Sequence, residues 1–168
     1  MPATHHIHGW KESVYTLGDA DIAGHHKTAF FCSRRYPAGA VLRIYDWAKE
    51  MRANGECVIS GFHSRLEQDA LDILLRGEQP LILVAARGLP KRYPPEVRQA
   101  IENGRLLVVS PFPASVCRIT AGTAHRRNVF MLSVAERIVV GHISGGGALA
   151  EALSCVAPHK EIIRLSEK

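Results

Sequence analysis

The chain has 168 residues, of which 46% are hydrophobic and 22% charged, and its formal net charge is +5. These values exclude global disorder and supply enough apolar material for one domain with a sizeable core. The positive charge suits an anionic partner such as a nucleotide or a nucleic acid, and it is equally the charge of an ordinary basic protein.

The four cysteines are widely spaced and form no CxxC pair, so we expect neither disulfides nor a zinc site. The sequence begins without a signal pattern and has no apolar run as long as a membrane span, which favours a cytoplasmic protein. His5, His6 and His8 lie close together near the start. We interpret them as part of a mobile terminus rather than a metal site, because nothing nearby would hold such ligands rigidly.

The first half of the chain begins with a polar, irregular stretch, which predicts an arm or short cap over residues 1–28. Apolar runs and helical spacing then alternate, and a Ser64–Glu67 capping box marks one helix start. The expected elements are a strand at 29–32, a helix at 41–51, a strand at 57–59 and a helix at 64–76.

The second half continues the alternation. The expected elements are a strand at 81–85, a helix at 94–104, a strand at 106–109, a helix at 121–132, a strand at 138–140, a short helix after the glycine run and a strand at 162–163. Strands that are apolar on both sides and alternate with helices predict an α/β, Rossmann-like fold. We therefore expect residues 29–168 to form one doubly wound domain, with a mostly parallel sheet and helices on both faces. The pattern does not give the strand order.

The residues after the expected strands are small, hydroxyl-bearing, glycine-rich and basic. Ligands of open parallel sheets bind beyond the carboxyl ends of the strands. Glycine lets the backbone approach a phosphate, and arginine adds a bidentate grip. The loops at 33–34, 60–64, 87–88, 110–111 and 144–147 together predict an anion pocket. The candidate ligand-binding residues are Ser33, Arg34, Ser60, Gly61, Arg127, Asn128, Gly145, Gly146 and Gly147.

Two parts of this set have plainer interpretations. The glycine run could be only a tight strand-to-helix turn, and Arg126 and Arg127 could lie on a solvated helix face. We favour ligand contact for the two arginines, because Asn128 lies beside them and the glycine run follows the next strand.

Residues for catalysis are sparse. The patterns GxxxxGK[ST], GxSxG and GxGxxG with a downstream acid are all absent, and no cofactor or metal is expected. Glu67, Asp69 and Asp72 share one helix, where a solvated face is the simpler interpretation. Glu151 is a weak candidate for a general acid or base, since it follows the glycine run closely.

Over residues 15–163, several short segments follow one another in a distinctive order: LGDADI, FFCSRRYPAG, VISGFHSRLEQDAL, GLPKRYPPEVRQAI, SPFP, HRRNVFMLSVAERIVV and GGGALAEAL. In these segments and their order, the sequence resembles the Rossmann-like domain of the DNA-processing protein A family (DprA, also called Smf). The positions that match the family pattern are Ser33, Arg34, Ser60, Gly61, Arg127, Asn128, Gly147, Ala148 and Leu149. The departures are Cys32 for a turn glycine, Arg65 and Glu67 for the glycine and aspartate of GID, and Val129 for the second arginine of RNR.

The resemblance implies binding of single-stranded DNA, delivery of that DNA to a recombinase of the RecA type in DNA recombination, and a homodimer. It implies no catalytic residues. The wider group includes the LOG-type phosphoribohydrolases, whose PGGxGTxxE loop carries a glutamate that acts on a nucleoside monophosphate. Here SGGGALAE is one residue shorter and lacks the threonine, which argues against the same chemistry.

Three hypotheses follow from the sequence. The first is a DprA-like module that holds single-stranded DNA or a nucleotide without catalysis. The second is a LOG-type nucleotide N-glycosidase, with Glu151 acidic and Arg127 on the phosphate. The third is a structural or nucleotide-sensing regulatory protein.

Overall fold

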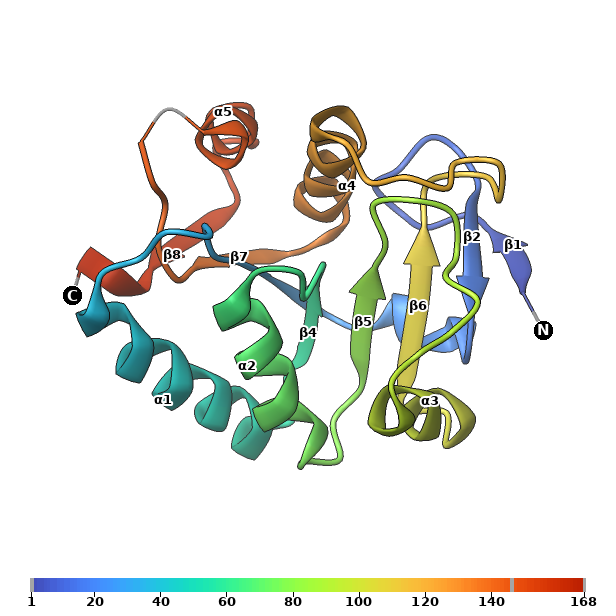
Figure 1. Cartoon of the computed structure of the whole chain (residues 1–168), viewed down its shortest axis with the longest axis horizontal. Helices are drawn as coiled ribbons and strands as arrows, with labels where there is room; N and C mark the ends of the chain where they lie inside the picture. Colours follow the sequence, from blue (N-terminus) through green and yellow to red (C-terminus); the bar gives the residue numbers. More distant parts are fainter. Residues whose placement is uncertain (1, 146, 168) are drawn as a thin grey trace.

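The computed structural model describes residues 2–145 and 147–167. Within them, eight strands form one sheet in the order β1-β2-β6-β5-β4-β3-β7-β8 (Figure 1). The strands are β1 (Ala3–His5), β2 (Val14–Leu17), β3 (Lys27–Phe31), β4 (Cys57–Ser60), β5 (Leu81–Val84), β6 (Leu106–Ser110), β7 (Arg137–Val140) and β8 (Glu161–Arg164). The helices are α1 (Ala38–Asn54), α2 (Arg65–Leu75), α3 (Pro95–Glu102), α4 (Ala121–Val134) and α5 (Ala148–Ser154), with short 3₁₀ turns η1 (Ala20–Gly24) and η2 (Leu165–Glu167).

The sheet separates two hydrophobic layers, and the prediction of a doubly wound fold is confirmed. One layer packs α1, α2 and α3 against the sheet, and the other packs α4, α5 and the segment before β3 against the opposite face. Adjacent strand residues alternate between the layers. Phe30 stacks on Trp47 of α1 with ring centroids 4.5 Å apart, whereas Phe31 faces the α4 side.

The helix boundaries follow from local signals in the sequence. Gly55 ends α1 in the left-handed conformation, with φ at 71°, which costs glycine no steric clash. Ser64 and Glu67 form the predicted capping box of α2, and Pro95 is the first residue of α3. These signals set where each loop at the carboxyl edge begins and ends.

The segment before β3 differs from the expected arm. Residues 3–5 and 14–17 form β1 and β2, which extend the sheet beyond β6: β2 pairs antiparallel with β6, and β1 pairs antiparallel with β2. In β2, Val14 and Thr16 are buried while Tyr15 is exposed, the alternation of a half-buried strand. Irregularity was the wrong inference, because a four-residue strand is too short to produce a clear periodic signal in the sequence.

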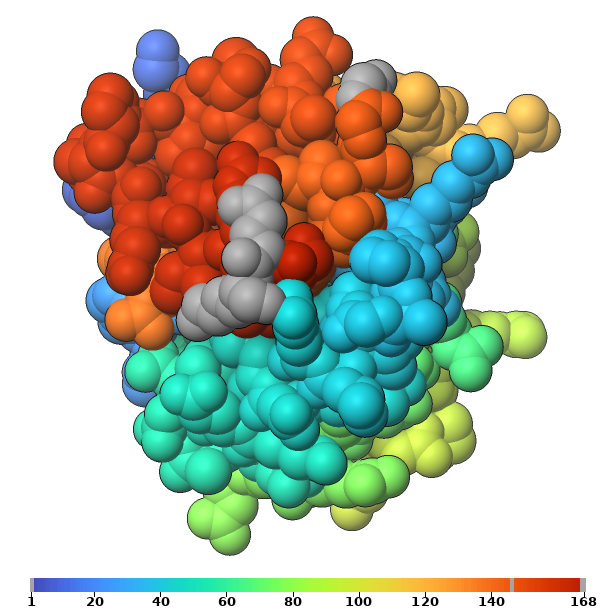
Figure 2. All heavy atoms as spheres, turned by 90° about the vertical axis from the view of Figure 1, so that its left-hand side faces the viewer, coloured from blue at the N-terminus to red at the C-terminus, as the bar shows by residue number. Residues whose placement is uncertain are grey.

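The sheet reverses its direction of growth at β3. The chain adds β4, β5 and β6 on one side of β3 and then returns to add β7 and β8 on the other. In the side view of Figure 2, α1 occupies the lower half in cyan, and the segment from β7 onward occupies the upper half in orange and red. The chain continues from β3 to α1 on one face of the sheet and from β7 to α5 on the opposite face. Doubly wound sheets bind ligands at the carboxyl ends of two such neighbouring strands.

Candidate functional site

A pocket of about 510 Å³ lies at this reversal point, beyond the carboxyl ends of β3, β4 and β7. Ser33 joins two of its walls: its backbone N–H donates to the His142 carbonyl at 2.9 Å, and its hydroxyl accepts from Ser144 N–H at 3.0 Å. The described lining residues are Phe31, Cys32, Ser33, Arg34, His63, Ser64, Glu67, Ile119, Thr120, Ala121, Ala124, Arg127, Asn128, Ser144, Gly147, Ala148 and Leu149.

Arg127 is the buried cation of this pocket, with 9% of its surface exposed. Its Nε and Nη2 both donate to Asn128 Oδ1 at 3.3 Å, so the neighbouring amide fixes one edge of the guanidinium. Burial lowers the pKa of Arg127, while the negative charge of Glu67 counteracts that shift. Because the ordinary pKa of arginine is far above neutrality, the group stays charged and can receive an anion.

Gly61 makes room for this guanidinium. A Cβ atom at position 61 would lie 2.7 Å from Arg127 Nη1 and 2.8 Å from Arg127 Cζ, closer than real Cβ contacts allow. Ser60, the preceding residue, is fully buried, and its hydroxyl donates to the Phe30 carbonyl at 2.9 Å and accepts from Phe62 N–H at 3.1 Å. Ser60 therefore shapes the turn after β4, and Gly61 gives Arg127 its position.

Glu67 does not lie on a solvated face, contrary to the expectation from the sequence. It is 7% exposed, and its carboxylate accepts from Cys32 N–H at 3.0 Å, His63 N–H at 2.9 Å and Ser64 N–H at 3.3 Å. A carboxylate at the start of α2 is stabilised by these donors and by the positive end of the helix. Glu67 thus binds the turn after β3 to the turn after β4.

The other predicted residues have varied positions. Arg34 is exposed and lines the pocket, as does Gly147. Gly145 is exposed and is not among the described lining residues, and Gly146 lies outside the described part of the chain. Glu151 is exposed on α5, beyond Leu149, where the described lining ends on that helix.

Arg126 and Arg127 are neighbours on α4 but have different surroundings. Arg126 pairs with the Glu12 carboxylate, and its guanidinium lies 5.2 Å from the centre of the Trp10 ring. It fastens the segment before β3 to α4 instead of facing the pocket. The sequence favoured ligand contact for both arginines, but only Arg127 is among the described residues that line the pocket.

The first turn of α4 forms a wall that the sequence did not indicate. Thr120 caps the helix, because its hydroxyl accepts from Thr123 N–H at 3.1 Å. Ala121 and Ala124 line the pocket, and their small side chains occupy little of its space. The positive end of a 14-residue helix thus faces the space beside Arg127. The capping box was hidden because threonine, rather than glutamate or glutamine, occupies its third helical position.

Cys32 also lines the pocket, but as an unreactive thiol. Burial, and secondarily the charge of Glu67, raises the pKa of Cys32 to about 12. The thiol therefore keeps its proton at neutral pH, and a protonated thiol is a poor nucleophile.

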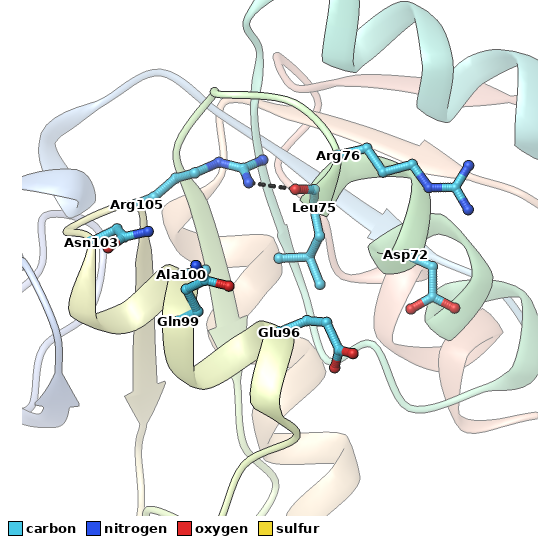
Figure 3. A pocket seen from close by; sticks show the side chains of 8 residues that line it. All are labelled: Asp72, Leu75, Arg76, Glu96, Gln99, Ala100, Asn103 and Arg105. Atoms are coloured by element: carbon cyan, nitrogen blue, oxygen red, sulfur yellow. Dashed lines mark hydrogen bonds between the residues drawn. The ribbon is translucent and has the colours of Figure 1, made fainter.

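A second hollow, of about 600 Å³, lies at the opposite, amino edge of the sheet between α2 and α3 (Figure 3). Arg105 is engaged there: it donates to the Leu75 carbonyl at 2.7 Å and to the Gln79 carbonyl at 2.8 Å. Asp72 and Glu96 project into the space between the helices, so the lining has mixed charge. This hollow lacks the cationic character of the pocket at the carboxyl edge.

Within residues 2–145 and 147–167, no cluster of three metal-binding side chains occurs. No helix in the same part of the chain combines the length and the apolarity that crossing a membrane requires.

The family model for DNA recombination-mediator protein A matches residues 3–168. The chain belongs to this family. Comparison with curated proteins gives no match. Among solved structures, DNA processing protein A from Helicobacter pylori, described with its single-stranded DNA binding mode, has a TM-score of 0.72 at 17% identity, over 91% of this chain and 74% of that one.

DNA processing protein A (DprA) from Streptococcus pneumoniae has the same TM-score of 0.72 at 15% identity, over 90% of this chain and 54% of that one. The chain thus spans about half the length of that relative. A molybdenum cofactor binding protein from Rippkaea orientalis is a more distant match, with a TM-score of 0.57 at 9% identity, over 82% of this chain and 74% of that one. At these identities the structures establish the shared Rossmann-like fold of the DprA family.

Proposed function

We propose that this DprA family member binds single-stranded DNA without catalysis, at the pocket where the sheet reverses. Arg127 and Arg34 hold phosphate groups, with Ser33, Asn128 and Gly147 around them. The observation that carries the proposal is the Arg127 guanidinium, which is buried, fixed by Asn128 and seated over Gly61. A fixed cation loses little freedom when it binds an anion, so the arrangement favours phosphate binding.

Family membership supports DNA as the anion. The Helicobacter pylori relative is described as binding single-stranded DNA, and it covers 91% of this chain at the level of the fold. Ser33, Arg34, Arg127 and Asn128 match the family pattern and line one pocket. We assign the phosphate contacts of a single strand, or of a nucleotide within it, to these residues.

The chemistry of the residues that line the pocket supports ligand binding without catalysis. The Glu67 carboxylate is engaged by three backbone N–H groups, and the Cys32 thiol stays protonated. Glu151, on which a nucleotide N-glycosidase would depend, is exposed and outside the described lining. Release of free base from nucleoside monophosphates that disappears in Glu151→Gln would favour the enzyme and overturn this part of the proposal.

The proposal also covers the partner protein, the oligomeric state and the cellular location. Following the family resemblance, we assign a RecA-type recombinase as the recipient of the bound strand, a homodimer as the working form and the cytoplasm as the location. Light scattering of the free chain tests for the dimer, and co-elution with a recombinase on single-stranded DNA tests for the complex from which the strand would be transferred.

The test compares two neighbouring arginines on α4. We expect Arg127→Gln to weaken binding of an oligothymidylate at least tenfold, because a buried charge-assisted contact is lost. Arg126→Gln removes the same charge one residue away, and we expect its affinity to stay within about twofold of the native value. Fluorescence anisotropy at two salt concentrations gives both numbers. Equal affinities for the two variants, or binding by the native chain that does not weaken with salt, would contradict the proposal.

A further inference from the structure

The loops after β5 and β6 carry a concentration of positive charge that the pocket does not use. Residues 85–94 and 111–120 contain four cations and no acid, although the chain has 16 acidic residues among 168. All four are exposed. We call them the basic ridge: Arg87, Lys91, Arg92 and Arg118.

The ridge cations are free of ion pairs with acids in residues 2–145 and 147–167. The four ion pairs of this part of the chain belong to other cations: Lys27, Arg65, Arg126 and Arg137. Exposed cations without acidic partners make an electrostatic footprint for a polyanion, since each can release a counterion from a phosphate backbone.

The two loops are held together as one surface. Gly88 N–H donates to the Val116 carbonyl at 2.8 Å, and the Ser110 hydroxyl donates to the Arg87 carbonyl at 2.5 Å. A Cβ atom at Gly88 would lie 2.7 Å from the Pro113 carbonyl oxygen, so the loops are in close contact. The positions of Arg87 and Arg118 are therefore fixed relative to each other through their backbones.

The same surface is continuous with the pocket. Arg118 directly precedes Ile119 and Thr120, which are part of the pocket wall. In the sheet order β6-β5-β4-β3, the ridge loops follow β5 and β6, which lie on the far side of β4 from β3. Three interstrand steps of about 4.8 Å place β6 about 14 Å from β3. A nucleic-acid ligand that extends from the pocket beyond β3 to the loop after β6 must therefore contain more than one nucleotide.

We infer that the basic ridge is a second phosphate-binding surface, over which a single strand held in the pocket continues across the carboxyl ends of β4, β5 and β6. Arg118 and Arg87 contact successive phosphates beyond the pocket. This inference rests on the proposed function and adds that the ligand is a polynucleotide of several residues, bound along a track.

The experiment removes ridge charge and varies strand length. The ridge variant is Arg87→Gln with Arg118→Gln, and the matched control is Lys49→Gln with Arg76→Gln, which removes the same charge from exposed positions on α1 and at the amino edge. Fluorescein-labelled oligothymidylates of about 2 nucleotides, too short to extend from the pocket along the ridge, and of about 20 nucleotides are titrated by anisotropy at several salt concentrations. Circular dichroism melting confirms that all variants fold.

For the native chain, we expect the longer strand to bind more tightly. The ridge variant should lose about tenfold in affinity for the longer strand and less than twofold for the shorter one. Its slope of log affinity against log salt should fall by about 0.7 for each phosphate contact removed. The control variant should keep the native affinities and slope.

The outcomes separate this inference from the proposed function. If the ridge variant binds strands of both lengths with native affinity, the ridge does not contact the strand. That result would overturn the further inference but not the proposed function, and it would favour an acidic protein as the partner of the ridge. An equal loss of affinity in the ridge and control variants would also overturn the further inference, because the effect would then come from the net charge of the protein and not from the position of the ridge. Failure of the native chain to bind either strand would overturn the proposed function and the track together.

Discussion

Arg126 and Arg127 illustrate what a sequence can specify at the scale of the residue. Both are adjacent cations in one helix, and successive helical positions point about 100° apart. One turns toward Trp10 and Glu12, and the other turns toward Gly61. The basic cluster was visible in the sequence, but its division into a structural and a candidate ligand-binding arginine depended on where the segment before β3 packs.

Gly61 gives the sharpest prediction at this scale. We expect Gly61→Ala to weaken oligothymidylate binding by about tenfold, because the added Cβ displaces the Arg127 guanidinium from its seat. The unfolding free energy should change little, since the clash is with the end of a flexible side chain.

Gly39→Ala is the control for Gly61→Ala. A Cβ at Gly39 meets no atom within 4 Å, and alanine in α1 should stabilise the helix by up to about 1 kcal/mol. Anisotropy titration and urea unfolding of both variants check the pair. An unchanged DNA affinity in Gly61→Ala would mean that the position of Arg127 does not matter for binding.

At the scale of the element, Glu67 connects three parts of the fold. Its carboxylate caps α2, accepts from His63 N–H in the turn after β4, and holds the turn after β3 through Cys32 N–H. The sequence revealed the capping box, because Ser64 and Glu67 have the required spacing. It did not reveal the link to the turn after β3, because that contact joins residues 35 positions apart.

Glu67→Ala should destabilise the protein by about 2–4 kcal/mol, since it leaves buried N–H donors without an acceptor. For a chain of this size, the melting temperature should fall by about 5–10 °C. Glu102→Ala, an exposed glutamate at the end of α3, should melt within about 2 °C of the native chain. Calorimetry compares the three proteins, and equal melting temperatures would show that Glu67 is not a structural clamp.

The start of β3 and the start of β7 meet in a pair whose strength depends on pH. Lys27 N–H donates to Glu136 Oε2 at 2.6 Å, and Lys27 Nζ lies 3.3 Å from Glu136 Oε1. Burial opposes the ionisation of Glu136, but the hydrogen bonds and the charge of Lys27 outweigh it and hold the pKa of Glu136 below its ordinary value of 4.5.

A carboxyl group with a lowered pKa in the folded state stabilises the fold above its unfolded pKa, and this contribution disappears as the pH falls through the folded pKa. We therefore expect the native chain to be more stable than Glu136→Gln at pH 7, and this difference to shrink below about pH 4.5. Urea unfolding at a series of pH values measures it. A difference that stays constant from neutral to acid pH would contradict the ionic role of Glu136.

At the scale of the whole molecule, the alternation of apolar strands and helices predicted the fold class, because each buried strand appears in the sequence as a continuous run of apolar residues. The strand order and the place of β1 and β2 were not predictable in this way. Both depend on pairing between residues far apart in the sequence, such as Tyr15 with Ser110. Parallel strands bring their carboxyl ends to one edge, and on that ground a pocket was predicted there. Of the five loops predicted to form it, those at 33–34, 60–64 and 144–147 contribute described lining residues, whereas those at 87–88 and 110–111 contribute none.

The two edges of the sheet differ in charge, and this difference is the basis of the functional account. The carboxyl edge carries the pocket around Arg127 and the basic ridge, whereas the amino edge carries a hollow in which Asp72 and Glu96 accompany the arginines. A single strand should therefore bind at one edge only, and a method that locates the contact residue by residue can decide this.

The most direct measurement is a titration of the ¹⁵N-labelled chain with an oligothymidylate, followed by amide chemical shifts. We predict the largest changes at Arg34, at Ile119–Ala124, at Arg127 and at Gly147, with small changes over 72–76 and 96–105. Changes concentrated at the amino edge, or no change around Arg127 under conditions where the strand binds, would contradict the assignment of the pocket as the DNA-binding site.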